Sequence, residues 1–175
     1  MTVTFRKAAE ADLDAVCAIY DAVISEEEAG HGVTGWKRGT YPVRATAEAA
    51  LARDDLYVAE ADGKVHASAV LNRIQVDVYA DAPWEHDAPD EEVFVMHTLV
   101  VDPTARRCGL GQAFEAFYES LAREQGCRYL RIDTNERNTR ARALYHKLGY
   151  KEIAVVPCTF NGLEGVQLVL LEKAL

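Results

Sequence analysis

The sequence contains little positive charge and no basic run. It has 19 Lys and Arg residues against 28 Asp and Glu residues, which gives a formal net charge of −9 at pH 7. Proteins that bind nucleic acid depend on neutralising phosphates, so this balance argues against nucleic acid as a partner. An acidic chain favours cationic partners instead.

Long apolar runs and linker-like stretches are also missing. No segment approaches the roughly 20 apolar residues of a membrane-spanning helix, and the polar N-terminus has no signal-peptide pattern. We therefore expect a cytoplasmic protein with no membrane partner. The chain has 175 residues, 49% of them hydrophobic, and it contains no low-complexity segment. These values predict one domain over residues 1–175.

Cysteine is scarce and scattered. The four cysteines are Cys17, Cys108, Cys127 and Cys158, and none of them forms a Cys-x-x-Cys pair. Zinc sites and disulfide frameworks show closely spaced or regularly paired cysteines. We therefore expect free thiols and no metal site.

The residue patterns that are present predict an α/β fold with a central sheet. Apolar alternation bounded by turn residues predicts strands, and a helical period of apolar residues predicts helices. The pair Asp62-Gly63 between two apolar runs predicts a hairpin, because both turn positions need a positive φ. Strands are expected near 3–7, 56–61, 65–73, 92–101, 128–133, 151–158 and 166–172, and helices near 11–26, 44–53, 110–125 and 138–147.

A glycine pair joins one of these strands to a helix. The loop between the strand near 92–101 and the helix near 110–125 ends in Arg106-Arg107-Cys108-Gly109-Leu110-Gly111. Such a loop lets backbone N–H groups converge, and the helix that follows adds its own unpaired N–H groups and positive dipole end. A phosphate-bearing cofactor is expected there. The loop is not a Rossmann loop, because the third glycine of the Gly-x-Gly-x-x-Gly pattern would fall at Phe114. It is not a Walker loop either, because no Gly-Lys-Ser/Thr follows.

This Arg-x-x-Gly-x-Gly pattern after Val-Asp-Pro resembles the acetyl-CoA signature of the GCN5-related N-acetyltransferase (GNAT) family. The segment 130–150, with its strand, asparagine, helix, tyrosine and Leu-Gly-Tyr ending, is similar to a second family motif. Residues 5–8 and 12–20 resemble the first strand and helix of the family. The resemblance implies the GNAT fold, with a mixed, mostly antiparallel sheet of six to seven strands. About four helices would flank this sheet, and it would be splayed at the acetyl-CoA site.

The resemblance also implies which residues hold acetyl-CoA. The glycine loop would bind the diphosphate, the backbone of the fourth strand would pair with the pantetheine arm, and the second motif would supply an asparagine and a tyrosine. In this sequence the corresponding residues are Leu99, Val100, Val101, Arg106, Arg107, Cys108, Gly109, Leu110, Gly111, Gln112, Asn138 and Tyr145.

Two residues are expected to be catalytic. Tyr145 would protonate the leaving thiolate, because a phenol with a pKa near ~10 keeps its proton at neutral pH. His97 lies on the order of 16 Å upstream of the strand end, about the reach of a pantetheine arm, and would take a proton from the amine. Its place resembles that of a catalytic histidine in the arylalkylamine branch of the family. Glu92 or a water chain is the alternative base, and packing in the core is the alternative role for His97 and Tyr145.

The acceptor side is less defined. Trp36, Tyr41 and Tyr79 are expected to form an aromatic wall, and Glu92 or a loop aspartate is expected to hold an ammonium group. The alternative is a loop that packs its own aromatic residues and leaves its carboxylates solvated. These residues favour transfer to a small primary amine or an amino-acid-like compound in a ternary complex. Protein N-termini, lysines, another acyl donor and a non-catalytic acyl-CoA-binding role stay open. A homodimer formed through the strands near 151–158 and 166–172 stays open as well.

Overall fold

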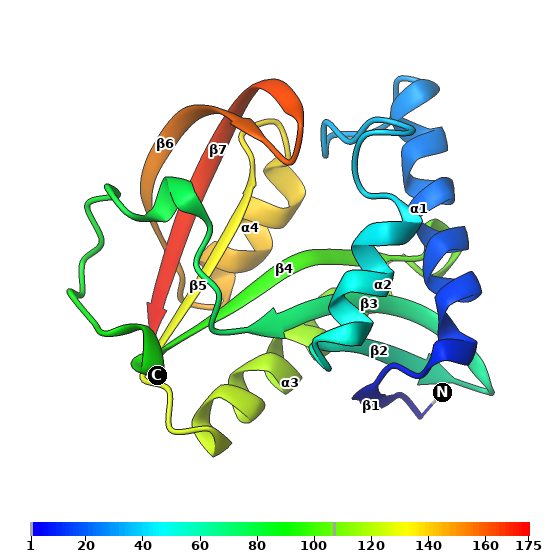
Figure 1. Ribbon diagram of the computed structural model, residues 1–175, viewed down its shortest axis with the longest axis horizontal. Helices are drawn as coiled ribbons and strands as arrows, with labels where there is room; N and C mark the ends of the chain where they lie inside the picture. Colours follow the sequence, from blue (N-terminus) through cyan, green and yellow to red (C-terminus); the bar gives the residue numbers. More distant parts are fainter. Residues whose placement is uncertain (1, 107) are drawn as a thin grey trace.

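A single mixed sheet organises the computed structural model, which describes residues 2–106 and 108–175. Its seven strands lie in the order β1-β2-β3-β4-β5-β7-β6. They are β1 (Thr4–Lys7), β2 (Leu56–Ala61), β3 (Lys64–Asn72), β4 (Val93–Val101), β5 (Tyr129–Asn135), β6 (Lys151–Phe160) and β7 (Leu163–Ala174). Neighbouring strands are antiparallel except β4 and β5, which are parallel. The predicted fold class is therefore confirmed (Figure 1).

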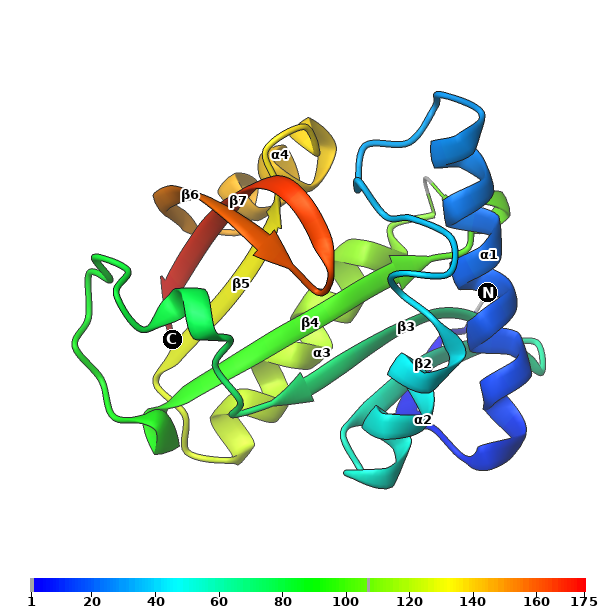
Figure 2. The ribbon, with the colours of Figure 1, turned by 45° about the horizontal axis from the view of Figure 1, so that its top comes forward.

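Helices cover both faces of the sheet. They are α1 (Leu13–Glu28), α2 (Arg44–Ala52), α3 (Leu110–Glu124) and α4 (Thr139–Lys147). Apolar residues of α1 and α2 pack on one face, and those of α3 and α4 pack on the other face, so the sheet separates two cores (Figure 2). No helix in the described ranges is long and apolar enough to cross a membrane.

The sheet opens between β4 and β5. These strands pair only over Val93–Met96 and Tyr129–Ile132. Beyond that point β5 continues beside β7 and β4 continues beside β3, and the two strands diverge (Figures 1 and 2). The register between β3 and β4 also shifts here, where Thr98 adopts a φ of 52°. This bulge bends β4 away from β5, so the predicted splay has a local cause.

Both ends of the sheet contain tight hairpins. The turn between β2 and β3 has positive φ angles at Asp62 and Gly63, as the sequence predicts. A second hairpin of this kind joins β6 and β7 through Asn161 and Gly162, with φ angles of 51° and 77°. Because of this short turn, β6 and β7 extend beyond the predicted ranges, and their hairpin rises beside the opening in the sheet.

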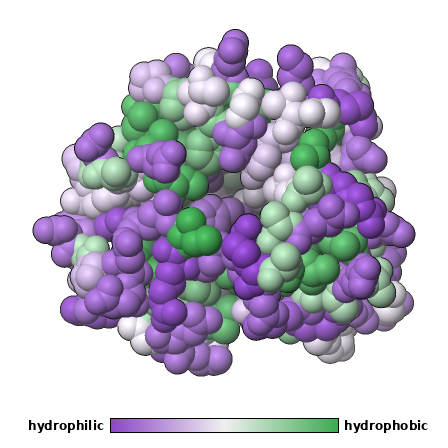
Figure 3. Space-filling view, in the orientation of Figure 1, coloured by the Kyte–Doolittle hydropathy of each residue, from purple (hydrophilic) through white to green (hydrophobic). Residues whose placement is uncertain are grey.

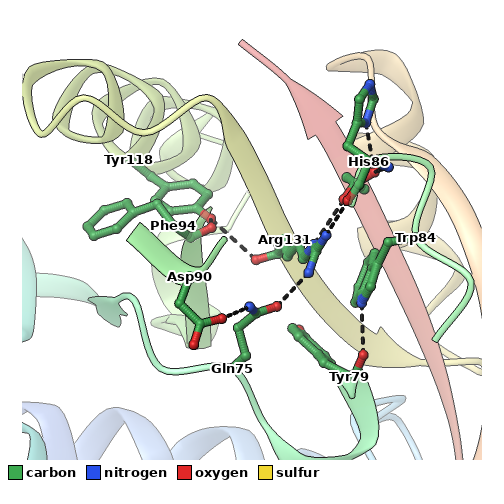
Figure 4. A network of polar contacts seen from close by, with 9 residues as sticks. Gln75, Tyr79, Trp84, His86, Asp90, Phe94, Tyr118 and Arg131 are labelled. Carbon is green, nitrogen blue, oxygen red and sulfur yellow. Dashed lines mark hydrogen bonds and ion pairs between the residues drawn. The ribbon is translucent and has the colours of Figure 1, made fainter. Parts of the chain in front are cut away.

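The long segment between β3 and β4 is anchored to the sheet by Arg131 of β5. The Arg131 guanidinium donates to Glu172 of β7 at 2.9 Å, to Gln75 at 2.6 Å and to the His86 carbonyl at 2.8 Å. It also lies 4.1 Å from the centre of the Trp84 ring (Figure 4). The segment therefore packs as a fixed layer over β5 and β7.

Candidate active site

A cavity of about 1130 Å³ lies where β4 and β5 diverge. Its wall contains residues from α1, the loop after α1, β4, the start of α3, β5, α4 and the β6–β7 hairpin. In Figure 3 the molecule is hollowed near the centre of this face, and hydrophobic residues gather beside the hollow on the β6–β7 side. The cavity is large enough for a nucleotide cofactor arm and a small second substrate.

One end of the cavity is built by the glycine loop. Gly109 is the N-cap of α3 with a φ of 74°, and no side chain caps this helix among the described residues. Gly109, Leu110, Gly111 and Gln112 all line the cavity, so the unpaired N–H groups of the first turn of α3 lie at its wall. A Cβ atom at Gly109 would meet open space, but its backbone conformation disfavours any other residue. This end fits the phosphates of a nucleotide cofactor.

The neighbouring residues of the loop differ in placement. Arg106 lines the cavity, and its guanidinium contacts the carboxylate of Glu26 at the end of α1. Cys108 is exposed and does not line the cavity, and its Sγ lies 3.9 Å from the Arg106 carbonyl oxygen. Arg107 lies outside the described residues.

The wall next to this loop is the free edge of β4. Leu99, Val100 and Val101 line the cavity. Val100 and Val101 pair with β3 on one side, while their other edge faces the gap that β5 has left. An extended chain with amide groups can pair with such an edge, as a strand would. The predicted pantetheine contacts are therefore accessible in the fold.

Tyr145 enters the cavity from α4. Its side chain is only 6% exposed, and no hydrogen bond to its hydroxyl occurs among the described residues. Burial, and then the nearby charge of Asp133, raise the pKa of Tyr145 well above its usual value. Asn138 lines the same wall, and its Oδ1 caps α4 by accepting from the Ala141 N–H at 3.2 Å. Asn138 thus fixes the start of the helix that positions Tyr145.

His97 lines the cavity on β4 and is held from behind. Its Nε2 lies 3.0 Å from Oδ1 of Asn72, whose Nδ2 donates to Asp55 at 2.9 Å. Asp55 in turn accepts from Arg53 at 2.8 Å. Because the Asn72 oxygen faces the ring, Nε2 carries the proton of the neutral imidazole. Burial lowers the pKa of His97 to about 4, below the value near 6.5 that the sequence prediction assumed.

The structure adds Asp133 of β5, which the sequence analysis missed. Asp133 lines the cavity, and its Oδ2 accepts from the Tyr79 hydroxyl at 2.7 Å. Burial raises the pKa of Asp133 to about 6, and the hydrogen bond from Tyr79 partly opposes this shift. The sequence does contain a signal, because Arg131 and Asp133 alternate with the apolar Leu130 and Ile132 in a central strand. That pattern places two charges on one face of a covered sheet.

The other end of the cavity is aromatic, as predicted for two of the three residues. Trp36 and Tyr41 line it, with ring centres 6.0 Å apart in a T-shaped arrangement. The Tyr41 hydroxyl hydrogen-bonds to the Thr98 hydroxyl at the bulge of β4. Burial raises the pKa of Tyr41 to about 12, so this phenol is neutral.

Two predicted acceptor residues lie outside the cavity wall, which corrects their assignment. Tyr79 is buried, packs against Trp84 and reaches the cavity only through Asp133. Glu92 lies just before β4, where its carboxylate faces Arg128 at 3.5 Å. It is five residues from His97, roughly 16 Å along the strand, and therefore at the closed end of the β4–β5 pair.

Part of the chain is similar in sequence to known proteins. The model of the acetyltransferase (GNAT) family matches residues 18–150. A mycothiol acetyltransferase of Cellulomonas flavigena is 31% identical over 98 residues, which are 56% of this chain and 27% of that protein. The matched part thus spans about a quarter of the length of this relative.

Solved structures share the whole fold. A GNAT-family acetyltransferase from Streptococcus agalactiae superposes with a TM-score of 0.81 at 22% identity, over 99% of this chain and 95% of that one. A protein from Salmonella typhimurium, solved with its cofactor acetyl-CoA, gives a TM-score of 0.72 at 19% identity over 99% and 94% of the two chains.

Proposed function

Because the chain belongs to the acetyltransferase (GNAT) family, whose acyl donor is acetyl-CoA, we propose that it transfers an acetyl group to a small primary amine by direct attack in a ternary complex. In this reaction the amine nitrogen bonds to the acetyl carbon and the carbon–sulfur bond breaks. An acceptor that is bound as an ammonium ion first releases one proton to solvent, because only the neutral amine can attack. The neutral amine then loses a second proton as the nitrogen–carbon bond forms, and the departing thiolate gains one, so that one proton is released overall.

One observation carries the proposal. The glycine loop, the free edge of β4 and the Tyr145 hydroxyl, which has no hydrogen-bond partner within the described part of the chain, line one continuous cavity. The other end of this cavity, the aromatic chamber, is formed by Trp36 and Tyr41. A nucleotide held at Gly109 and Gly111 can extend its arm along Leu99–Val101 toward the chamber. The acetyl group would then meet the acceptor between β4 and β5.

We propose Tyr145 as the general acid. Burial, and then the nearby charge of Asp133, raise its pKa, so the hydroxyl keeps its proton at neutral pH. It gives that proton to the sulfur only as the carbon–sulfur bond breaks and negative charge develops there. The cap at Asn138 holds the helix that carries this side chain. In the neutral core an ionised phenol is costly, which favours rapid return of a proton to Tyr145 after each turnover.

The predicted base, His97, is neutral throughout the physiological range. With its pKa near 4, it lies about six units below an alkylammonium group, which corresponds to about 9 kcal/mol for a full proton transfer before attack. His97 therefore accepts the proton only while the nitrogen–carbon bond forms, when the nitrogen has become acidic. The chain Arg53–Asp55–Asn72 behind the ring fixes its orientation for this step.

The test measures thiol release from acetyl-CoA with a panel of amines, amino acids and short peptides. Tyr145→Phe should lower kcat by about 100-fold or more with little change in acetyl-CoA affinity. His97→Gln should lower kcat and spare the affinity as well. Tight acetyl-CoA binding without turnover on any acceptor would contradict the proposal and favour a non-catalytic acyl-CoA-binding protein. Turnover on peptides alone would contradict the small-amine acceptor.

A further inference from the structure

Asp133 stands at the point where the sheet opens. It directly follows Ile132, the last residue of β5 that pairs with β4, and Ile132 faces Met96 in that pairing. The next residue on each strand is therefore Asp133 on β5 and His97 on β4. Residues in parallel register point to the same face, so both side chains lie on the face opposite α3 and α4, where the aromatic chamber is.

The bonding of this carboxylate is incomplete. A carboxylate offers about four acceptor sites, yet Asp133 has one hydrogen bond, from Tyr79, and no ion pair among the described residues. The titratable groups whose charge is coupled to it are Tyr41, Tyr79, Tyr145 and Cys158. Each has a raised pKa and is neutral at pH 7, so none of them compensates the negative charge.

The chamber around Asp133 is mostly apolar. The aromatic pair Trp36 and Tyr41 forms one side, and the β6–β7 hairpin forms another. The apolar residues of the wall on this face include Val76, Phe160, Leu163, Val166 and Leu168. Such a wall favours an apolar ligand body, and its aromatic rings also favour a nearby cation.

The cationic side chains of the cavity wall are engaged or lie elsewhere. Arg53 makes two hydrogen bonds to Asp55, at 2.8 and 3.2 Å. Arg106 belongs to the glycine loop and contacts Glu26. Arg140 lies in the first turn of α4, on the other face of the sheet. A carboxylate on the acceptor would therefore meet the negative charge of Asp133 without a free cation on this part of the described wall.

Resting on the proposed function, we propose that Asp133, positioned by Tyr79, binds the ammonium group of the acceptor, and that the acceptor is an apolar primary amine without a carboxylate or phosphate. The positive charge of the ligand then complements the negative charge of Asp133, which no ion pair among the described residues compensates. The apolar body of the ligand lies against the hairpin and the aromatic pair. Tyr79 is a positioning residue, because it contacts Asp133 and not the chamber.

The first experiment measures binding without chemistry. With CoA present, calorimetry compares N,N-dimethyl-2-phenylethylamine, a cation that cannot be acetylated to a stable amide, with the neutral 2-phenylethanol. Wild type should bind the cation at least about 10-fold more tightly, and Asp133→Asn should abolish that preference. The exposed loop residue Glu85, paired with Lys151 at 2.7 Å, provides the matched control, and Glu85→Gln should keep the preference. A preference that survives in Asp133→Asn would overturn the proposal.

The second experiment measures turnover with 2-phenylethylamine and with phenylalanine, which adds a carboxylate to the same skeleton. Wild type should strongly prefer the amine, and Asp133→Asn should raise its KM by about 30-fold or more. Equal turnover of phenylalanine, or an unchanged KM in Asp133→Asn, would overturn this inference while leaving the acetyltransferase proposal intact. No turnover of any amine, with charge-dependent binding preserved, would instead overturn the proposed function and keep the binding site. Melting curves confirm that each variant is folded.

Discussion

Strand β5 carries two charged residues two positions apart, and their surroundings differ sharply. Arg131 is 4% exposed and uses all its guanidinium nitrogens, on Glu172, Gln75 and the His86 carbonyl. Asp133, on the same face, has one hydrogen-bond partner in the described ranges, Tyr79, and opens onto a cavity. A fully partnered charge fixes the position of its neighbours, whereas an under-partnered charge at a cavity is available to a ligand.

The two residues are nevertheless connected. Arg131 holds the segment between β3 and β4 (Figure 4). The same segment carries Tyr79, whose hydroxyl donates to Asp133. The partnered charge therefore supports the group that orients the under-partnered one. Substitution of Arg131 should therefore act mainly on stability, and substitution of Asp133 mainly on the preference for ligand charge.

The largest effect is expected from Arg131→Met. It leaves Glu172, which is 2% exposed, as a buried carboxylate whose remaining contacts are the backbone N–H and ring of His86. Breaking one partner of a buried pair costs about 3 to 5 kcal/mol of unfolding free energy. Urea unfolding measures this loss of unfolding free energy. The exposed Arg44, paired with Asp14 and Glu48, gives the control, and Arg44→Met should change stability by less than about 1 kcal/mol. Similar losses of unfolding free energy in Arg131→Met and Arg44→Met would contradict this prediction.

Asp133→Asn should raise the free energy of unfolding, whereas Arg131→Met should lower it. Burial raises the pKa of Asp133 to about 6 from a usual 3.8, so its ionised form destabilises the fold at every pH above 6. The amide removes that cost, and the variant should be about 1 to 3 kcal/mol more stable than wild type at pH 8. As the pH falls from 6 to below 4, wild type becomes protonated and the gain should disappear. Urea unfolding at pH 8 and pH 4 checks it, and a destabilised variant at pH 8 would contradict the functional interpretation.

The smallest effect is expected from Tyr79→Phe, because this substitution removes only a hydroxyl. The hydrogen bond from Tyr79 lowers the pKa of Asp133, so its loss should move that pKa above 6. Amine affinity needs the ionised carboxylate, and the acidic limb of kcat/KM should therefore shift to higher pH while the plateau changes little. A limb at the same pH in wild type and Tyr79→Phe would show that another group, such as His97, controls it.

The sequence predicts the fold well because its signals are local. The Asp62-Gly63 turn and the Gly109-x-Gly111 loop specify backbone shapes within a few residues, and both are found where expected. The Asn161-Gly162 pair carries the same turn signal, which the sequence analysis did not use, and the strands predicted near 151–158 and 166–172 are too short. The splay of the sheet, in contrast, was expected from family resemblance, and its local cause at Thr98 has no signature in the sequence.

The acceptor side is predicted less well because its contacts join distant segments. The path of the segment that carries Tyr79 depends on two contacts of Arg131. One is with Glu172, 41 residues away in the sequence, and the other is with Gln75, 56 residues away. Spacing alone cannot show that Tyr79 turns toward Asp133, or that Glu92 falls at the closed end of the strand pair. The charge pattern of β5 is the signal that points to this site from the sequence.

With acetyl-CoA bound at the glycine loop as proposed, its diphosphate competes with the Glu26 carboxylate for the Arg106 guanidinium. A diphosphate that reaches the glycine loop finds the guanidinium already neutralised by a carboxylate from α1. It must displace that carboxylate or bind through the backbone N–H groups alone, so the net attraction is weaker than a free arginine would provide. Added salt then has two opposing effects. It screens the incoming phosphates, which weakens binding, and it loosens the pair of Arg106 and Glu26, which favours binding. The affinity for acetyl-CoA should therefore depend less steeply on ionic strength than the charges of the cofactor suggest.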